Sequence, residues 1–288
     1  MARTKPWEVS DQLWERVRPL IPERGPRLKG GRPPNDDRKM FAAIVYLLRT
    51  GIPWNAMPHE LGASSTVYDR FRLWEEQGFF QHLWQAGLEE YDELEGLDWK
   101  WQSLDGTQIK SPFGGGFTGK NPVDRSKRGT KRSQLCEGHG LPLAVVLEAA
   151  NRNDMICALA TLDAIITERP DPEVVEQHLC LDAGYDYPQL LEEMTRRGYT
   201  THARPNWWNR NHAHPATAEQ LAAGLEKQPG KQPRRWVVER LHAWLNHFRR
   251  ILIRWDKLPQ CYLTLVQLAC ALICFQQCDR LRSFPVSG

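Results

Sequence analysis

The spacing of apolar residues changes near residue 98, and this change restricts the chain to two parts of different structural class. Before it, apolar residues recur at helical spacing, as they do over residues 40–48. After it, Trp99–Leu104 alternates between apolar and polar residues, which is typical of a strand. We therefore predict an all-α domain over residues 1–97 and an α/β domain over residues 98–288.

Composition agrees with two folded domains. The 288 residues are 41% hydrophobic and 25% charged, close to the average for globular proteins, so each part can bury a core. The net charge of +3 does not by itself indicate a nucleic-acid partner. Basic residues are nevertheless concentrated locally: Lys120–Arg132 holds six and one acid, and Leu225–Lys257 holds nine and three acids. Such blocks are typical of surfaces that bind phosphate.

Cysteine usage and apolar runs predict a cytoplasmic chain. The seven cysteines include no CxxC pair, so no disulfide framework is expected. Cys270, Cys274 and Cys278 share one face of a predicted helix. Metal ligation is one interpretation, and a buried apolar stripe is the favoured one. The N-terminus has no apolar segment of the kind that signal peptides carry, and the apolar run 263–275 is interrupted and short, so no membrane association is expected.

A helix-turn-helix pattern is predicted over about residues 54–77. Trp54–Leu61 and Ser64–Gln77 are expected to be helical, with Gly62 in the turn between them. An ordinary three-helix bundle without DNA contact is the alternative that this spacing leaves open. The second helix carries polar residues that could reach phosphates or base edges from the major groove. These are Ser65, Thr66, Arg70 and Arg72.

Two aspartates follow predicted strands of the second domain. Asp105 ends the strand Trp99–Leu104, Asp182 ends a short apolar strand at 178–181, and Glu239 lies on a long predicted helix. Ligands of open α/β sheets gather at the carboxyl ends of strands, so the three carboxylates could meet. Each also has a structural interpretation, as a turn or cap residue or, for Glu239, as the i+4 partner of Arg235. Residue types alone do not separate these acids from four others: Asp124, Asp154, Asp163 and Asp186.

Three clustered carboxylates suit two-metal phosphodiester chemistry. Two Mg²⁺ ions about 3.5–4 Å apart can stabilise the entering and leaving oxygens of an in-line displacement. Mg²⁺ prefers hard oxygen ligands and binds through few carboxylates plus substrate phosphate. In this hypothesis Asp105 bridges two ions, Asp182 binds one and Glu239 binds the other, and Mn²⁺ can substitute.

Three motifs together resemble the DDE transposases of bacterial insertion sequences, and the insertion sequence five family most of all. The motifs are Leu104–Thr107, Leu181–Tyr185 and Arg234–Asn246, in the expected order. The segments Gly119–Lys131 and Leu141–Asp154 are similar to the intervening part of that family, and the region around Gly51–Trp54 to its DNA-binding domain. The resemblance covers nearly the whole chain.

The resemblance implies a fold, an activity and partners. It implies an RNase H-like catalytic domain with Asp105, Asp182 and Glu239 as the catalytic and metal-binding triad, after a helix-turn-helix-like domain. The enzyme would bind the terminal inverted repeats of an insertion sequence, cleave there, and transfer the strand to target DNA. The resemblance also implies that double-stranded DNA is the partner and that the enzyme acts as a homodimer on that DNA. The expected location is the nucleoid of a bacterial cytoplasm. The alternatives are a nuclease of the same fold without strand transfer, and a domesticated DNA-binding regulator.

The sequence also departs from the family pattern around Glu239. Related transposases carry a Tyr–Arg–Glu–Lys signature there, but Gln232 and Asn246 stand at the Tyr and Lys positions. Arg249 or Arg250, one turn further on, could supply the missing phosphate contact. The candidates for holding phosphates are Lys131, Arg132, Arg235, Arg240, His242 and Arg249.

A tryptophan pair precedes that motif. Trp207 and Trp208 could stack on an extruded base, with plain loop packing as the favoured alternative. His212 and His214 lie nearby without the further Cys or His ligands that a zinc site requires.

Overall fold

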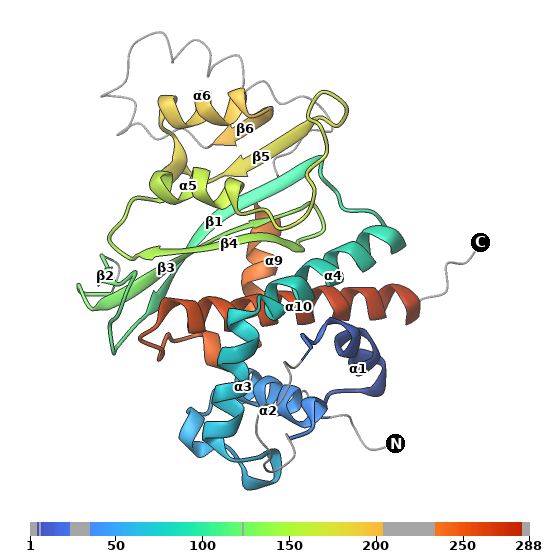
Figure 1. Ribbon diagram of the computed structural model, residues 1–288. Helices are drawn as coiled ribbons and strands as arrows, with labels where there is room; N and C mark the ends of the chain where they lie inside the picture. Colours follow the sequence, from blue (N-terminus) through green and yellow to red (C-terminus); the bar gives the residue numbers. More distant parts are fainter. Residues whose placement is uncertain (1–4, 6, 24–34, 123, 204–233, 284–288) are drawn as a thin grey trace. The chain divides into compact units, whose positions relative to one another are not determined.

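The computed structural model describes residues 5, 7–23, 35–122, 124–203 and 234–283. The chain divides into two compact units (Figure 1). The helical unit comprises Met1–Leu94 and Trp244–Gly288, and the sheet unit comprises Glu95–Ala243. The first division lies close to the expected boundary after residue 97. The second was not expected, because the sequence-based domain ran from residue 98 to the end of the chain.

Side-chain and glycine caps set the ends of helices in the helical unit. Asp36 accepts a hydrogen bond of 3.0 Å from the Lys39 N–H and so begins α2, and Gly51, with φ 77°, ends it. The apolar face of this helix is fully buried. The principal helices of the unit are α1 (Asp11–Val17), α2 (Asp37–Thr50), α3 (Ser64–Glu76), α4 (Phe79–Leu94) and α10 (Pro259–Ser283).

Helix α10 packs along α4, which explains why the C-terminal segment groups with the N-terminal helices. The two helices approach closely at Gly87, where an added Cβ would lie 2.9 Å from the Cβ of Cys274. Cys270, Cys274 and Cys278 are buried in α10, so the interpretation of these residues as a buried stripe is confirmed. The apolar run 263–275 was expected to be too short for a membrane span, but the helix that contains it is longer than that run. Helix α10 is long and apolar enough, although 78% of its most apolar window is buried inside the structure.

The predicted helix-turn-helix over residues 54–77 is formed only in its second half. Helix α3 is present, but residues 54–61 form two separate 3₁₀ turns, η2 (Trp54–Ala56) and η3 (His59–Leu61), instead of one helix. Pro58 separates them, because proline lacks a backbone N–H and disfavours helical geometry in the residue before it.

The sheet unit contains six strands in one mixed sheet (Figure 1). Strand β1 lies at its centre, antiparallel to β3 on one side and parallel to β5 on the other; β6 continues in parallel beyond β5. Strands β2 and β4 both pair with the far edge of β3. The strands are β1 (Trp101–Lys110), β2 (Gly119–Lys120), β3 (Arg128–Cys136), β4 (Pro142–Ala149), β5 (Gln177–Leu181) and β6 (Tyr199–Ala203).

Three helices accompany the sheet. Helix α5 (Asp154–Asp163) connects β4 to β5 and bonds Thr161 to Ser133 of β3 at 2.7 Å, and α6 (Pro188–Arg196) packs on β6. Helix α9 (Trp236–Leu245) lies on the face of β1 opposite to the one that α5 covers. Three antiparallel strands, followed by parallel strands joined through helices, form the RNase H-like arrangement that the family resemblance implied.

Two elements differ from the sequence-based expectation. Asp105 lies inside the ten-residue strand β1, where a strand end was expected. Its position is still the carboxyl end of the parallel pairing, because β1 pairs with β5 only through Ser103. The long helix expected over 234–255 ends at Leu245, and a 3₁₀ turn, η5 (Arg249–Ile251), follows.

Candidate active site

Alternate residues of β1 face helix α9. The Ser103 hydroxyl donates to the Arg234 carbonyl at 3.1 Å, and the Thr107 hydroxyl lies 3.1 Å from Nε2 of His242. Side chains two residues apart on a strand share a face, so Asp105, between these two anchors, faces the same helix. The alternation of β1 therefore directs Asp105 toward the segment that carries Glu239.

Asp182 is brought to the same region by strand register. Cys180 of β5 pairs with Ser103 of β1, so Asp182 and Asp105 each lie two residues beyond a matched pair. The strand β5 ends at Leu181, and the carboxylate of Asp182 then accepts the Gly184 N–H at 2.8 Å. This bond caps the 3₁₀ turn η4 (Ala183–Tyr185) and fixes the aspartate at the strand end, as predicted.

Glu239 lies in the first turn of α9 and is more open than the two aspartates. Its side chain is 55% exposed. One oxygen lies 3.5 Å from the Arg235 guanidinium, the i−4 partner expected from the sequence, and the other lies 3.7 Å from Nδ1 of His242. The carboxylate is thus held by its own helix rather than by the sheet.

The three carboxylates act on one another electrostatically. The pKa of Asp105 is raised to about 6, mainly because burial disfavours the charged form. A hydrogen bond from Gly106 N–H to this carboxylate, at 2.7 Å, opposes the rise, as does the charge of Arg235. The negative charges of Asp182 and Glu239 add to it. A cation among these groups would relieve the repulsion.

The donor set fits a divalent cation, but the site is only partly assembled. All three residues offer carboxylate oxygens, the ligands that Mg²⁺ and Mn²⁺ prefer. Within the described ranges, no three His, Cys, Asp or Glu side chains are placed to hold an ion as they stand. The Glu239 carboxylate is engaged along α9 by Arg235 and His242.

His242 was expected to hold phosphate, but its buried ring would offer no positive charge for that contact. Its pKa is lowered to about 4, mainly by burial and further by the charge of Arg132. The ring is therefore neutral near pH 7. Its contacts with Thr107 and Glu239 give it a role in joining β1 to α9 instead.

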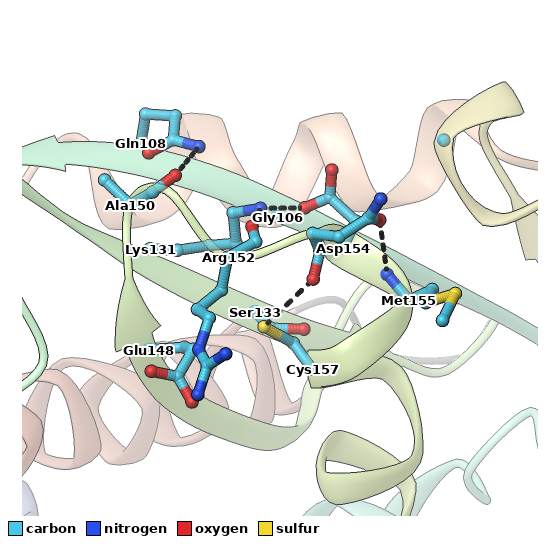
Figure 2. A network of polar contacts seen from close by, with 12 residues as sticks. Gly106, Gln108, Lys131, Ser133, Glu148, Ala150, Arg152, Asp154, Met155 and Cys157 are labelled. Carbon is cyan, nitrogen blue, oxygen red and sulfur yellow. Dashed lines mark hydrogen bonds and ion pairs between the residues drawn. The ribbon is translucent and has the colours of Figure 1, made fainter. Parts of the chain in front are cut away.

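Lys131 also differs from its predicted role as a phosphate contact. Its side chain is only 3% exposed and forms an ion pair of 2.7 Å with Asp154 at the start of α5. The ammonium also donates to the Arg152 carbonyl. Figure 2 shows Lys131 and Asp154 meeting beside Gly106. Gly106 follows Asp105 in β1, and adjacent strand residues face opposite sides, so the pair lies on the face of β1 opposite to Asp105. A buried lysine needs such a partner, so the pair occupies the ammonium.

The remaining candidate cations of the sheet unit are engaged to different degrees. Arg132 is buried, with 1% of its surface exposed. Arg240 donates to the His139 carbonyl at 2.9 Å and lies over the ring of Trp236. Arg235 keeps 33% of its side chain exposed beside Glu239, so it is the candidate closest to the triad that solvent can reach.

The other predicted phosphate and DNA contacts lie in the helical unit, and their contacts are described within that unit. Arg249 lies on η5, in the helical unit, packed against Gly51. On α3, Arg70 pairs with Asp37, and Arg72 pairs with the glutamates one turn further on. Ser65 is exposed and Thr66 is half-buried on the same helix. Trp207 and Trp208, together with His212, His214 and Gln232, lie outside the described residues.

Sequence reasoning missed three residues around the triad. Thr107 could have been found from strand alternation, since it lies two residues after Asp105. Asp154 was considered only as a rival carboxylate, and its distance of 2.7 Å from Lys131 depends on long-range packing. Tyr185 is fully buried, and burial together with the charges of Asp154, Asp105 and Asp182 raises the pKa of its phenol. Its hydroxyl has no hydrogen-bond partner among the described residues.

Comparison with known proteins places this chain in a family. Residues 102–274, more than half of the chain, match the family described as transposase DDE domain, and residues 9–84 match a putative transposase of the IS4/5 family. The putative transposase for insertion sequence element IS402 of Burkholderia cepacia is 34% identical over 166 residues, which cover 57% of this chain and 71% of that protein. The uncharacterised protein y4sN of Sinorhizobium fredii is 28% identical over 104 residues, which cover 36% of this chain and 76% of that protein.

Among solved structures, a pre-cleavage Mos1 transpososome aligns over 93% of this chain and 86% of that one, with 10% identity and a TM-score of 0.27. The Mos1 strand transfer complex aligns over 86% of this chain and 81% of that one, with 11% identity and the same TM-score of 0.27. The sequence matches, which span both units, confirm the resemblance found in the motifs: the chain belongs to the DDE transposases of insertion sequences.

Proposed function

We propose that Asp105, Asp182 and Glu239 are the catalytic carboxylates with which this transposase cleaves DNA at the ends of its insertion sequence and joins them to target DNA. One observation supports the assignment: burial mainly causes the rise in the pKa of Asp105 on β1, and the charges of Asp182, at the end of β5, and Glu239, on α9, both add to it. Enzymes of this family depend on divalent metal ions. We infer two Mg²⁺ ions here, with Mn²⁺ able to substitute.

Each residue has a distinct task in this proposal. Bound metal would supply Lewis-acid stabilisation of the entering and leaving phosphodiester oxygens and activate the attacking hydroxyl. Asp105, whose pKa is raised by burial and by the charges of both other acids, would suit the position shared between two ions. Asp182 would hold an ion from the strand end, with its orientation fixed by the Gly184 N–H. Glu239 would hold an ion from α9 in place of its contact with Arg235, and the Arg235 guanidinium would then be available to phosphate.

The helical unit is the candidate for end recognition. Its residues 9–84 match the putative transposase family of the IS4/5 type, and α3 presents Ser65 and Thr66 at its beginning. Two element ends must be brought together for transposition, so we infer that the enzyme acts as a homodimer on DNA. Action on bacterial DNA places it in the cytoplasm with the nucleoid.

The experiment that tests this function separates transposition from simple hydrolysis. Full-length protein is incubated with Mg²⁺, a duplex carrying a pre-nicked terminal inverted repeat, and a plasmid target. We expect joined products that are absent in EDTA. The Glu239→Gln variant should lose cleavage and joining while it retains end binding. Cleavage without joining would favour a nuclease of the same fold. Binding without either reaction in the wild type would favour a DNA-binding regulator.

A further inference from the structure

The described part of the connection from β1 to β3, residues 110–122 and 124–128, forms an exposed basic arm. Its five cations are Lys110, Lys120, Arg125, Lys127 and Arg128, all of them exposed. Its one acid, Asp124, lies 3.5 Å from Lys110. The other four cations form no ion pair within the described part of the chain. Positive charge without internal partners is thus concentrated on one segment, which is typical of a surface that binds phosphate.

Two large apolar side chains are exposed on the same arm. Phe113 is 57% exposed and Phe117 is 50% exposed, among the largest values for any apolar residue of the described chain. Phenylalanine is costly to leave in water, and its exposure beside cations is common where proteins contact sugars and base edges of nucleic acids. The arm therefore offers both kinds of group that a DNA surface accepts.

The arm has a defined conformation that carries local strain. Thr130 donates to the Phe117 carbonyl at 2.8 Å, and the buried Asn121 accepts from and donates to the backbone of the Asp124–Lys127 turn. Every non-glycine residue with positive φ in the described ranges lies in this arm: Phe117 at 54°, Arg125 at 50° and Ser126 at 59°. Such backbone is strained and clusters at ligand-binding sites. Two of these residues are among the exposed aromatic and basic groups.

The arm begins on the strand that carries Asp105. Lys110 lies five residues further along β1, which places the base of the arm about 17 Å from the catalytic carboxylate at about 3.3 Å per strand residue. Successive phosphates of a DNA strand are separated by about 3.4 Å along the duplex axis. That span corresponds to about five base pairs, and β1 and β3 form one continuous antiparallel ladder across it.

We propose that the basic arm binds the backbone of the duplex whose scissile phosphate lies at Asp105, about five base pairs from the cut. The exposed lysines and arginines contact phosphates, and Phe113 and Phe117 pack against sugars and base edges in the minor groove. This inference rests on the proposed function, since it takes Asp105 as the position of the cut. The arm acts on DNA placement and supplies no group to the reaction.

The first test measures the salt dependence of binding. Full-length protein binds a duplex carrying the element end in EDTA, so that no cleavage occurs, and Kd is measured across a series of KCl concentrations. The Lys120→Gln/Lys127→Gln variant should lower the slope of log Kd against log[KCl] by about 1.8, for two lost phosphate contacts. The matched control is Lys100→Gln/Arg196→Gln, which removes the same charge from exposed positions outside the arm, and it should leave the slope unchanged. An unchanged slope in the arm variant, or an equal fall in the control, would overturn the proposal.

The second test concerns the aromatic residues and the position of the contact. The Phe113→Ala/Phe117→Ala variant should weaken binding by about fivefold or more with no change in salt slope. Single methylphosphonate substitutions in the duplex should interfere with wild-type binding four to six nucleotides from the cut, about the span derived above, and this interference should vanish in the lysine variant. Interference elsewhere would contradict the placement. Because these readouts need no cleavage, they can fail while the triad stands, and an active Asp105→Asn variant would refute the triad without changing them.

Discussion

The hydroxyl of Thr107 and Nε2 of His242 lie 3.1 Å apart and join the strand that carries Asp105 to the helix that carries Glu239. Nδ1 of the same ring lies 3.7 Å from the Glu239 carboxylate. The lowered pKa of His242, about 4, keeps the ring neutral near pH 7. A neutral ring protonated on Nδ1 can face the carboxylate with its donor and accept from Thr107, so both contacts are satisfied by one tautomer.

Replacing the threonine tests this connection. Thr107→Val keeps the shape of the side chain and removes the hydroxyl, so His242 and α9 lose an anchor on β1. We expect cleavage to slow by on the order of tenfold or more, because small misplacements of reacting groups are costly, while end binding is retained. Thr195→Val, which removes a hydroxyl from the exposed face of α6, is the matched control. Equal rates for the two variants would show that the hydrogen bond does not position the site.

The metal-free site should destabilise the fold at neutral pH. The raised pKa of Asp105 means that a proton on this group stabilises the folded chain below about pH 4, and this contribution is lost as pH rises through about 6. Asp105→Asn imitates the protonated form. In EDTA at pH 7.5 it should be more stable than wild type, by up to about 3 kcal/mol, and the gain should vanish by about pH 4. Thermal unfolding at both pH values measures this, with Asp163→Asn at the exposed end of α5 as the control. A variant no more stable than wild type at pH 7.5 would exclude the electrostatic strain.

Metal binding should compete with the same proton. We expect the half-saturating Mg²⁺ concentration for the wild type to be flat above about pH 7 and to rise about tenfold per pH unit below about 6, since one proton leaves Asp105 as the ion binds. An aspartate with an ordinary pKa would show this rise only below about pH 4. Calorimetric titration with Mg²⁺ between pH 5 and 8 decides between them, and a flat affinity down to pH 5 would contradict the account.

The buried Lys131–Asp154 pair should support the fold and leave DNA affinity alone. Asp154→Ala leaves the ammonium buried without its counter-charge, so we expect a loss of about 3–5 kcal/mol in unfolding free energy. Lys131→Met should cost less, because the Asp154 side chain is 35% exposed and can be hydrated. The double variant should lose less than the sum of the two. Chemical denaturation measures all three, and the salt slope of DNA binding for Lys131→Met should equal that of wild type. A slope lowered by about one would restore the phosphate role.

Local pattern was enough to predict most elements, whereas the choice of Asp105, Asp182 and Glu239 as the proposed triad needed the family resemblance. Alternation over Trp99–Leu104 and the short apolar run before Asp182 indicated β1 and β5, and the family motifs singled out Glu239. Pattern failed where an element depended on residues distant in sequence. The grouping of α10 with α4 depends on close approach at Gly87, which a reading of segments in order does not reveal.

The role of a basic residue was harder to predict from sequence than the secondary-structure element in which it lies. Lys131 lies in a basic block and was assigned to phosphate, yet strand alternation directs it to the face covered by α5, where Asp154 pairs with it. Lys127, in the same block, lies in the connection before β3 and stays exposed. The two lysines differ in secondary structure and burial, and a count of basic residues reveals neither property.

The most direct test of the triad is the single-turnover rate of cleavage of an element-end duplex in Mg²⁺ by full-length Asp105→Asn. Asp163→Asn, which removes an equal charge from the exposed end of α5, is measured beside it. The account predicts that Asp105→Asn binds the duplex and cleaves it no faster than protein in EDTA, while Asp163→Asn cleaves at the wild-type rate. Cleavage by Asp105→Asn at the wild-type rate would contradict it.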